Sequence, residues 1–350
     1  MQKTRAAFKL SLRYCRQHEE VILAEKLAAN LMDKQFNKFW QNVRKQSSAK
    51  VTAKVNTVAG CVDDYEISDM WKTHFDSLYH SVDDDGSKQT FLQRMSELNK
   101  QHGRYVITVH DIAVHCSQQK RAKSVGPDAI PMECFIFGGT RLYIHLSILF
   151  NCFIRYGYLP KPFMQSLMIP LLKVKSGNVT DVDNYRAIAV STAVSKIFEC
   201  ATADEIVNVS DNDMYQFGFK KGHSTGLCTN ILKHTVNYYP SCGSHVFLCF
   251  VDFSKAFDKV NYWKLLNMLL DDGISSTLVG LLSFWFSHQE MCVKWNGVVS
   301  GCFSVGNGTR QGGVLSPYFF SRYIRSAAEH FCFSHWLLHW LYASKYLSLR

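Results

Sequence analysis

The twelve cysteines of the chain include no C-x-x-C pair and form no regular framework. Disulfide-rich secreted domains depend on such a framework, so the spacing favours reduced, mostly buried thiols in an intracellular compartment. The first residues, MQKTRAAFKLSLRYCRQ, contain no apolar core of the kind found in secretory signals. No apolar run reaches the roughly 18 residues of a membrane span. We therefore expect an intracellular protein, with no signal that separates nucleus from cytoplasm.

Composition and charge indicate a folded, basic chain. Of the 350 residues 47% are hydrophobic, including 24 Phe, 16 Tyr and 7 Trp, which is enough for a sizeable core. The net charge of +10 permits a polyanionic partner. Residues 1–60 carry twelve Lys and Arg against four acids, whereas residues 61–85 carry eight acids against Lys72 alone. This asymmetry suits either a basic arm that contacts nucleic acid or a solvated helix face.

The pattern of apolar residues predicts helices before about residue 105 and a mixed α+β domain after it. Helical spacing appears in residues 1–45 and again in 67–80, where Ser68 is the expected N-cap. Residues 142–154 read as a core helix. Strands are expected at 166–174 and 184–192, joined in a hairpin, and at 291–305 as a strand pair. Further helices are expected at 193–206, 276–286 and from Ser316 onward.

The segment HVFLCFVDFSKAFDKV places Asp252 at the end of the most apolar predicted strand, residues 245–253, just before a helical pattern that starts with Phe257 on its first turn. A buried carboxylate is costly unless it is paired or binds a cation. Mg²⁺ accepts one or two carboxylates together with phosphate oxygens and water. The alternative is an Asp that caps the next helix, with Phe257 in the core.

Four other residues could bind phosphate or a nucleotide. Lys173 and Arg186 stand at the ends of the predicted hairpin and supply a point charge and a planar fork, which suit a triphosphate. In the turn NGTRQGG, Gln311 supplies an amide and Gly312 lets backbone approach a ligand closely. Solvated strand ends and an ordinary turn before a helix are the competing interpretations.

Taken in order, these segments resemble the reverse transcriptases of non-LTR, LINE-type retrotransposons. VDFSKAFDKVNYWKLL is similar to the first palm motif of that family, GTRQGGVLSPYFFSRYI to the second, and LPKPFMQSLMIPLLKVKSGNVTDVDNYRAIAVSTAVSKIFE to the fingers motifs. QFGFKKGHST resembles a segment near the template path, and SVGPDAIPMECF a lead-in motif with Ala129 in place of the usual glycine. The close resemblance covers residues 105–328.

The resemblance implies a right-hand polymerase of α+β class. The expected parts are a helical N-terminal extension and linker over 1–105, fingers over 106–245, a partial palm over 246–328 and a divergent tail over 329–350. The implied reaction is addition of dNTPs to a DNA primer on an RNA template, with Mg²⁺ as cofactor. The implied roles are metal binding by Asp252 and the Phe253 carbonyl, nucleotide binding by Lys173, Arg186, Phe253, Phe257, Gln311 and Gly312, and nucleic-acid binding by Lys220, Lys221 and Ser224.

The sequence departs from this family in one respect. The family has a Tyr-x-Asp-Asp motif after the second palm motif, but here no Asp follows Asp272, and the only later acids are Glu290 and Glu329. The pairs at 63–64, 83–85 and 271–272 precede TRQGG and are expected to be solvated. We therefore expect a truncated or frameshifted palm that is inactive alone, with a non-catalytic RNA-binding remnant as the alternative. The tail residues His330, Cys332, His335 and His339 suggest zinc, although a tail of unselected composition explains them better.

Overall fold

The computed structural model describes residues 2–47, 57–82, 86–98, 105–173, 177–210, 217–220, 222–248, 250 and 252–332. The chain divides into two compact units, Met1–Asn56 and Thr57–Arg350. The helices between residues 57 and 105 pack within the second unit, and the boundary predicted near residue 105 stays a prediction. The boundaries of the fingers, palm and tail stay predictions.

The described part of the first unit consists of three helices, α1 (Gln2–Gln17), α2 (Glu19–Met32) and α3 (Phe36–Ser47). They agree with the helical spacing of the sequence. Their cationic side chains are exposed, namely those of Lys9, Arg13, Arg16, Lys26, Lys34 and Lys38. None of the described helices in either unit combines the length and apolar character needed to cross a membrane.

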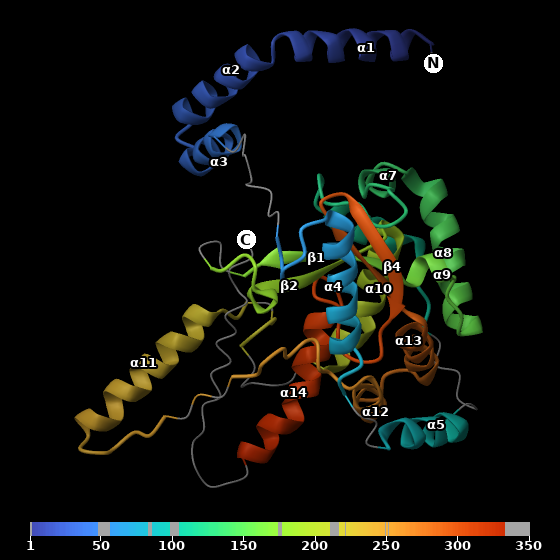
Figure 1. Cartoon of the computed structure of the whole chain (residues 1–350), viewed down its shortest axis with the longest axis vertical. Coiled ribbons are helices and arrows are strands. Elements are labelled where there is room, and N and C mark those ends of the chain that lie inside the picture. The colour runs from blue at the N-terminus through green and yellow to red at the C-terminus, as the bar shows by residue number, and fades with distance from the viewer. Residues whose placement is uncertain are drawn as a thin grey trace. The chain divides into compact units, whose positions relative to one another are not determined.

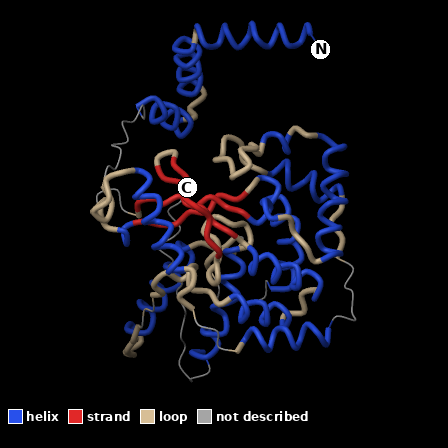
Figure 2. The backbone as a smooth tube through the Cα atoms, turned by 45° about the vertical axis from the view of Figure 1, so that its right-hand side comes forward, coloured by secondary structure: helices blue, strands red, loops and turns tan. Residues whose placement is uncertain are grey.

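The second unit is built on a mixed four-stranded sheet in the order β2-β1-β3-β4 (Figure 1). The strands are β1 (Gln165–Leu172), β2 (Tyr185–Ser191), β3 (Glu290–Trp295) and β4 (Val298–Ser304). β1 pairs antiparallel with β2 and parallel with β3, and β3 pairs antiparallel with β4. The predicted hairpin, the predicted strand pair and the mixed α+β class are confirmed. Figure 2 shows these strands as a single sheet surrounded by helices.

Helix α4 (Asp64–Leu78) packs on β3 and β4 and lies in front of the sheet in Figure 1. Its Trp71 is fully buried, with ring centroids 4.9 Å from Tyr185 and 6.2 Å from Trp295. Its N-cap is Asp63, whose carboxylate accepts from two backbone amides. The prediction of Ser68 as the cap is wrong: Ser68 is buried inside the helix and donates to the Val293 carbonyl at 3.4 Å.

An aromatic cluster joins α8 (Gly139–Tyr156), α9 (Lys161–Met164), α10 (Ala193–Ser210) and α13 (Ser276–His288). Phe198 is fully buried at its centre, and the rings around it are those of Phe150, Phe153, Phe163 and Trp285. Each buried Phe contributes about 1.5–3 kcal/mol relative to exposure, so this cluster is a main part of the core. The helices predicted at 142–154, 193–206 and 276–286 are confirmed.

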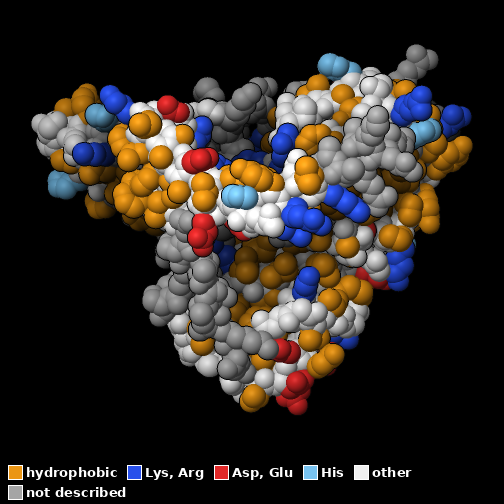
Figure 3. All heavy atoms as spheres, turned by 90° about the horizontal axis from the view of Figure 1, so that it is seen from above, with side chains coloured by type: hydrophobic (Ala, Val, Ile, Leu, Met, Phe, Trp, Pro, Cys, Tyr) orange, Lys and Arg blue, Asp and Glu red, His pale blue; other side chains and the backbone are white. Residues whose placement is uncertain are grey.

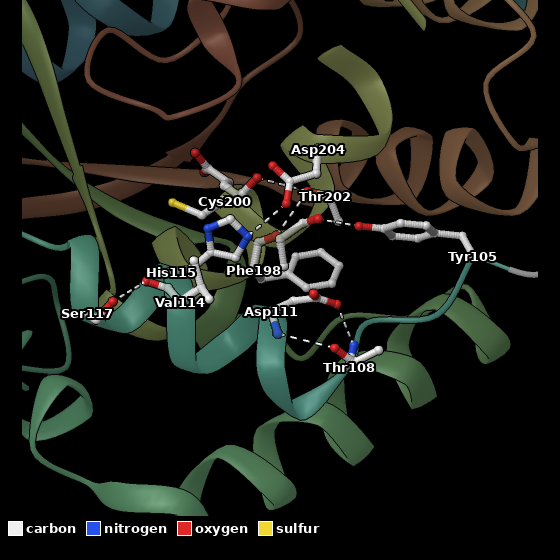
Figure 4. Close-up of polar contacts among 12 residues, drawn as sticks. Tyr105, Thr108, Asp111, Val114, His115, Ser117, Phe198, Cys200, Thr202 and Asp204 are labelled. Carbon is white, nitrogen blue, oxygen red and sulfur yellow. Dashed lines mark hydrogen bonds and ion pairs between the residues drawn. The ribbon is translucent and has the colours of Figure 1, made fainter. Parts of the chain in front are cut away.

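Helix α6 (Val109–Gln118) packs against α8 and α10. Thr108 and Asp111 form a reciprocal capping box at its start. Near its other end the His115 ring lies 3.1 Å from the Asp204 carboxylate, and before the helix Tyr105 donates to the Ala201 carbonyl. Figure 4 shows these contacts, which connect α6 and the segment before it to α10. The short helix α7 (Glu133–Ile136) follows α6.

The remaining helices are α5 (Ser87–Leu98), α11 (Thr225–Ser241), α12 (Tyr262–Asp271) and α14 (Ser316–Cys332). The helix predicted from Ser316 is confirmed. Asp272 lies at the end of α12 and is not solvated as predicted, because its side chain is 13% exposed and pairs with Arg322 of α14. Asp271 is 57% exposed and pairs with Arg94 of α5. α11 extends away from the sheet in Figure 1.

Cys292 on β3 and Cys302 on β4 are register partners and form a disulfide. The expectation of reduced thiols is wrong for this pair. It failed because the two cysteines are ten residues apart and only the antiparallel register of the hairpin brings their Cα atoms to 4.3 Å. Eight further cysteines in the described parts of the chain are free thiols. Two of them, Cys116 and Cys228, are buried.

A buried ion pair joins α10 to the turn before α14. Arg310, 9% exposed in its side chain, pairs with Glu199, which is 1% exposed. Arg310 also donates to Ser166 of β1 at 3.3 Å and stacks over Trp285 at 4.8 Å. The other oxygen of Glu199 accepts from the Val314 amide. The pair therefore connects the turn to a strand and two helices.

We expect Glu199→Ala to lower the free energy of unfolding by about 3–5 kcal/mol, because it leaves a buried guanidinium without its partner. Asp204→Ala removes a carboxylate that is 64% exposed on the same helix, and is expected to cost no more than about 1 kcal/mol. Chemical denaturation of both variants measures the difference. Equal losses would contradict the dominant role given to the buried pair.

Candidate functional site

The turn that contains Gln311 and Gly312 packs directly against β2. The Ala189 amide donates to the Gln311 carbonyl at 2.7 Å. Gly312 has φ +109°, and a Cβ at that position would lie 2.8 Å from the Ala189 carbonyl oxygen. Only glycine fits this conformation and this approach without strain. Arg186 lies three residues before Ala189 on β2. The fold therefore brings the turn with Gln311 and Gly312 next to the strand that carries Arg186.

Asp258 is a site residue that the sequence reasoning missed. It is 6% exposed and accepts from the Tyr79 hydroxyl at 2.9 Å and from the Gln311 side-chain amide at 3.2 Å. The sequence signal for it is its place in AFDKV, directly after Phe257 and six residues beyond Asp252. Because the Gln311 nitrogen donates to Asp258, the Gln311 side-chain oxygen remains the acceptor that a ligand could use.

Backbone contacts hold the segments 257–260 and 307–309 together. The amides of Thr309 and Gly308 donate to the carbonyls of Phe257 and Val260, both at 2.7 Å. The Asn307 side chain donates to the Asp258 carbonyl at 2.6 Å. Residues assigned to two separate palm motifs from the sequence therefore lie side by side.

Phe257 does not lie on the first turn of a helix, as the sequence predicted. It lies in a turn over residues 254–259, and α12 begins only after its N-cap, Asn261. Asn261 accepts from the amides of Trp263 and Lys264, so it provides the cap that the alternative reading gave to Asp252. The Phe257 ring stacks on Phe320 at 4.5 Å and meets Phe219 edge-on at 5.9 Å.

The strand predicted over residues 245–253 is not present in the described part of that segment, 245–248, 250 and 252–253. Phe247 and Phe250 are 89% and 70% exposed, and Asp252 is exposed. The prediction of a buried strand-end carboxylate is therefore wrong. An apolar run forms a buried strand only where a neighbouring strand completes its hydrogen bonds, and none of the four strands of the sheet pairs with this segment.

Lys173 lies at the end of β1, and its ammonium donates to the Asp183 carbonyl at 2.6 Å. Lys255 approaches the Asp183 carboxylate at 3.4 Å, which connects the turn before α12 to the hairpin loop. Burial raises the pKa of Asp258, while the hydrogen bonds from Tyr79 and Gln311 and the charges of Lys255 and Lys173 oppose the rise. Lys173 and Lys255 thus act electrostatically on the same carboxylate.

The loop before α11 carries the predicted nucleic-acid contacts. Ser224 is the N-cap of α11 and accepts from the Leu227 amide at 3.2 Å. Lys220 accepts from the His223 amide through its carbonyl at 3.1 Å. Lys221 lies outside the described residues. The Phe219 ring contacts Phe257, so this loop adjoins the site.

The described residues supply few metal ligands. They include no group of three His, Cys, Asp or Glu side chains that could hold a metal ion. Asp252 and the Phe253 carbonyl are oxygen donors of the kind Mg²⁺ accepts, and with substrate phosphates they would suit one ion.

Asp258→Asn is expected to change how stability depends on pH. Because the folded state raises the pKa of Asp258, its favourable contribution is present at acidic pH and lost as pH rises through the folded pKa. Asn keeps an oxygen for Tyr79 and carries no charge. Denaturation from acidic to neutral pH should show wild type losing stability relative to the variant as pH rises. A constant difference across that range would contradict this assignment.

Residues 173–343 match the family described as reverse transcriptase (RNA-dependent DNA polymerase). The match continues to residue 343, past the point near His330 where the sequence analysis expected the resemblance to end. Lys173, Arg186, Asp252, Phe257 and Gln311 all lie inside it.

Curated relatives point to the same family. The chain is 24% identical over 222 residues to a probable RNA-directed DNA polymerase from transposon X-element of Drosophila melanogaster, covering 61% of this chain and 24% of that protein. It is 25% identical over 225 residues to the RNA-directed DNA polymerase from mobile element jockey of Drosophila funebris, covering 61% and 24%. It is 28% identical over 176 residues to a putative 115 kDa protein in the type-1 retrotransposable element R1DM of Drosophila melanogaster, covering 50% and 17%.

The chain thus spans a quarter or less of the length of these three relatives. The family match and the relatives agree on one class of protein. Residues 173–343 match the reverse transcriptase family, and the chain resembles the RNA-directed DNA polymerases of non-LTR retrotransposons.

Proposed function

We propose that this chain is the fingers and part of the palm of an RNA-directed DNA polymerase, which adds dNTPs to a primer 3′-OH on an RNA template. The observation that carries the proposal is the contact between the turn 307–313 and β2 within the family match. This contact puts Gln311 and Gly312 beside the strand that carries Arg186. An amide, a close backbone approach and a guanidinium together suit a nucleotide with its triphosphate.

In this proposal each residue has a distinct role. Arg186 and Lys173 hold the triphosphate, and the Asp183 contact uses only one of the three donors of Lys173. Phe257 is held by Phe320 and Phe219 and faces the sugar. Gln311 and Gly312 line the nascent base pair. Asp258 positions Gln311 by accepting from its amide nitrogen.

Asp252 and the Phe253 carbonyl would hold Mg²⁺ together with the phosphates of the nucleotide. When bound, the ion would neutralise charge on the phosphoryl group. Lys220, Lys221 and Ser224 are proposed to contact the nucleic acid near Phe257. Lys220 does so by charge, and the contact would weaken with salt.

The proposed nucleotide contacts predict that Arg186→Ala weakens dNTP binding. The loss of charge-assisted hydrogen bonds should cost about 1.5–3 kcal/mol, or roughly tenfold to a hundredfold in Kd. Filter binding of a labelled dNTP in the presence of primer, RNA template and Mg²⁺ measures it. Arg155→Ala, which removes an exposed guanidinium at the end of α8, is the matched control and should leave Kd unchanged. Equal effects of the two variants would contradict the proposed site.

As it stands, the 350-residue chain is expected not to extend a primer. Two-metal phosphoryl transfer needs carboxylates for both ions, and after Asp272 the sequence contains no Asp and only Glu290 and Glu329. Glu290 pairs with Lys161 at 2.8 Å. A primer-extension assay with RNA template, dNTPs and Mg²⁺ measures incorporation. Robust extension that Asp252→Ala abolishes would refute the expected inactivity.

A second candidate is a non-catalytic RNA-binding protein. The exposed cationic side chains of α1, α2 and α3 favour it, since they suit contact with a phosphate backbone. This candidate predicts salt-dependent RNA binding without dNTP binding, so the dNTP filter-binding experiment separates the two.

A further inference from the structure

A pocket of about 540 Å³ opens beside β2, and it shares Gly312 with the proposed nucleotide site. Its walls come from the loop after α6, from β2 and from the first turn of α10. Three lysines line it, Lys120 and Lys123 from the loop and Lys196 from α10. Among the described residues that line the pocket there is no carboxylate and no aromatic ring.

Two close backbone contacts keep the pocket in place. Gly126, in the loop after α6, lies so close to β2 that a Cβ there would be 2.7 Å from the Ser191 carbonyl oxygen. Gly312, which also lines the pocket, packs against Ala189 on the same strand. β2 thus connects the pocket to the proposed nucleotide site, and neither wall can move without breaking backbone packing.

The lysines of the pocket are not neutralised by neighbouring side chains. Within the described parts of the chain, no hydrogen bond or ion pair engages the ammonium groups of Lys120, Lys123 and Lys196. Glu199, the acid that acts on Lys196, is already paired with Arg310. Burial lowers the pKa of Lys196, the charge of Glu199 opposes this, and the charges of Arg310 and Lys123 lower it further. Excess positive charge in a recess favours an anion.

The end of α10 reinforces this charge. Ala193, the first residue of this 18-residue helix, lines the pocket. Helix N-termini carry partial positive charge, although here the Thr192 hydroxyl already accepts from the Ser195 amide at 3.3 Å. Two independent sources of positive potential, lysines and a helix start, therefore meet in one cavity.

We propose that this pocket binds phosphate groups of a single-stranded nucleic acid backbone, next to the proposed nucleotide site. The inference rests on the proposed function, because that function supplies the strand. The ligand is recognised through phosphate and not through its bases, because lysines act as point charges and the pocket offers no ring for base stacking. Binding should therefore depend on salt and be independent of base sequence.

The test measures binding of a labelled single-stranded oligoribonucleotide of mixed sequence to the full chain by fluorescence anisotropy, at several salt concentrations. The pocket variant is Lys120→Gln/Lys123→Gln/Lys196→Gln. The matched control, Lys88→Gln/Lys161→Gln/Lys294→Gln, removes the same charge from exposed positions outside the pocket. Because Lys196 is half-buried, a second variant changes only the exposed Lys120 and Lys123.

We expect the triple pocket variant to bind at least about tenfold more weakly at low salt. Its slope of log K against log salt should be smaller by about 2, or roughly 0.7 for each lost phosphate contact on a single strand. The double variant should show about two thirds of that decrease in slope. The control should keep most of the wild-type slope. Equal losses in the control and the pocket variants would overturn the proposal.

Competition distinguishes a strand from free phosphates. Unlabelled RNA should displace the labelled strand at far lower phosphate concentration than inorganic tripolyphosphate or a dNTP. Equal displacement would show a site for free polyphosphate and would overturn the assignment to a strand. The readout needs no incorporation, so failure to extend a primer leaves this result interpretable. Conversely, if the chain extends a primer while the pocket variants bind RNA as well as the wild type does, only the proposed role of the pocket is refuted, and the proposed function stands.

Discussion

The buried pair between Arg310 and Glu199 is the interaction on which the arrangement of the site depends. Both partners are almost fully enclosed, so each requires the other to offset the loss of water. Arg310 also contacts Ser166 on β1 and Trp285 on α13, and Glu199 accepts from the Val314 amide. The pair therefore fixes the turn 307–313 against β1, α10 and α13, while the Gly312 contact fixes it against β2.

With that turn in place, parts of the chain that are far apart in sequence converge. Tyr79 comes from α4, Asp258 from the turn before α12, and Gln311 from the turn before α14, yet one hydrogen-bonded group unites them. Asp258 accepts from both of the others in a buried setting where its charge is disfavoured. Helix α4 lies outside the family match at residues 173–343, so the segment before the family domain still shapes the proposed nucleotide site.

The sequence predicted elements well where local pattern and packing agree. The β1–β2 hairpin consists of two apolar runs joined by a polar loop, and the helices α10, α13 and α14 follow apolar periodicity. Predictions failed where the local sequence pattern indicated one structure and long-range packing produced another. Ser68 resembles a cap but is buried against β3, and residues 245–253 resemble a buried strand although the described residues among them pair with no strand of the sheet. Asp258 was missed because its burial depends on Tyr79, which lies 179 residues away.

The sequence by itself determined the class of protein, the order of most elements and the residue types available for chemistry. The order of the motifs indicated the family, because Lys173, Arg186, Asp252 and Gln311 can be recognised from their neighbours in the sequence without knowledge of the fold. Only the tertiary structure decided that Gln311 is held by Asp258, that Cys292 meets Cys302, and that three lysines share a cavity beside β2. These depend on strand register and on long-range contacts, which local propensity does not encode.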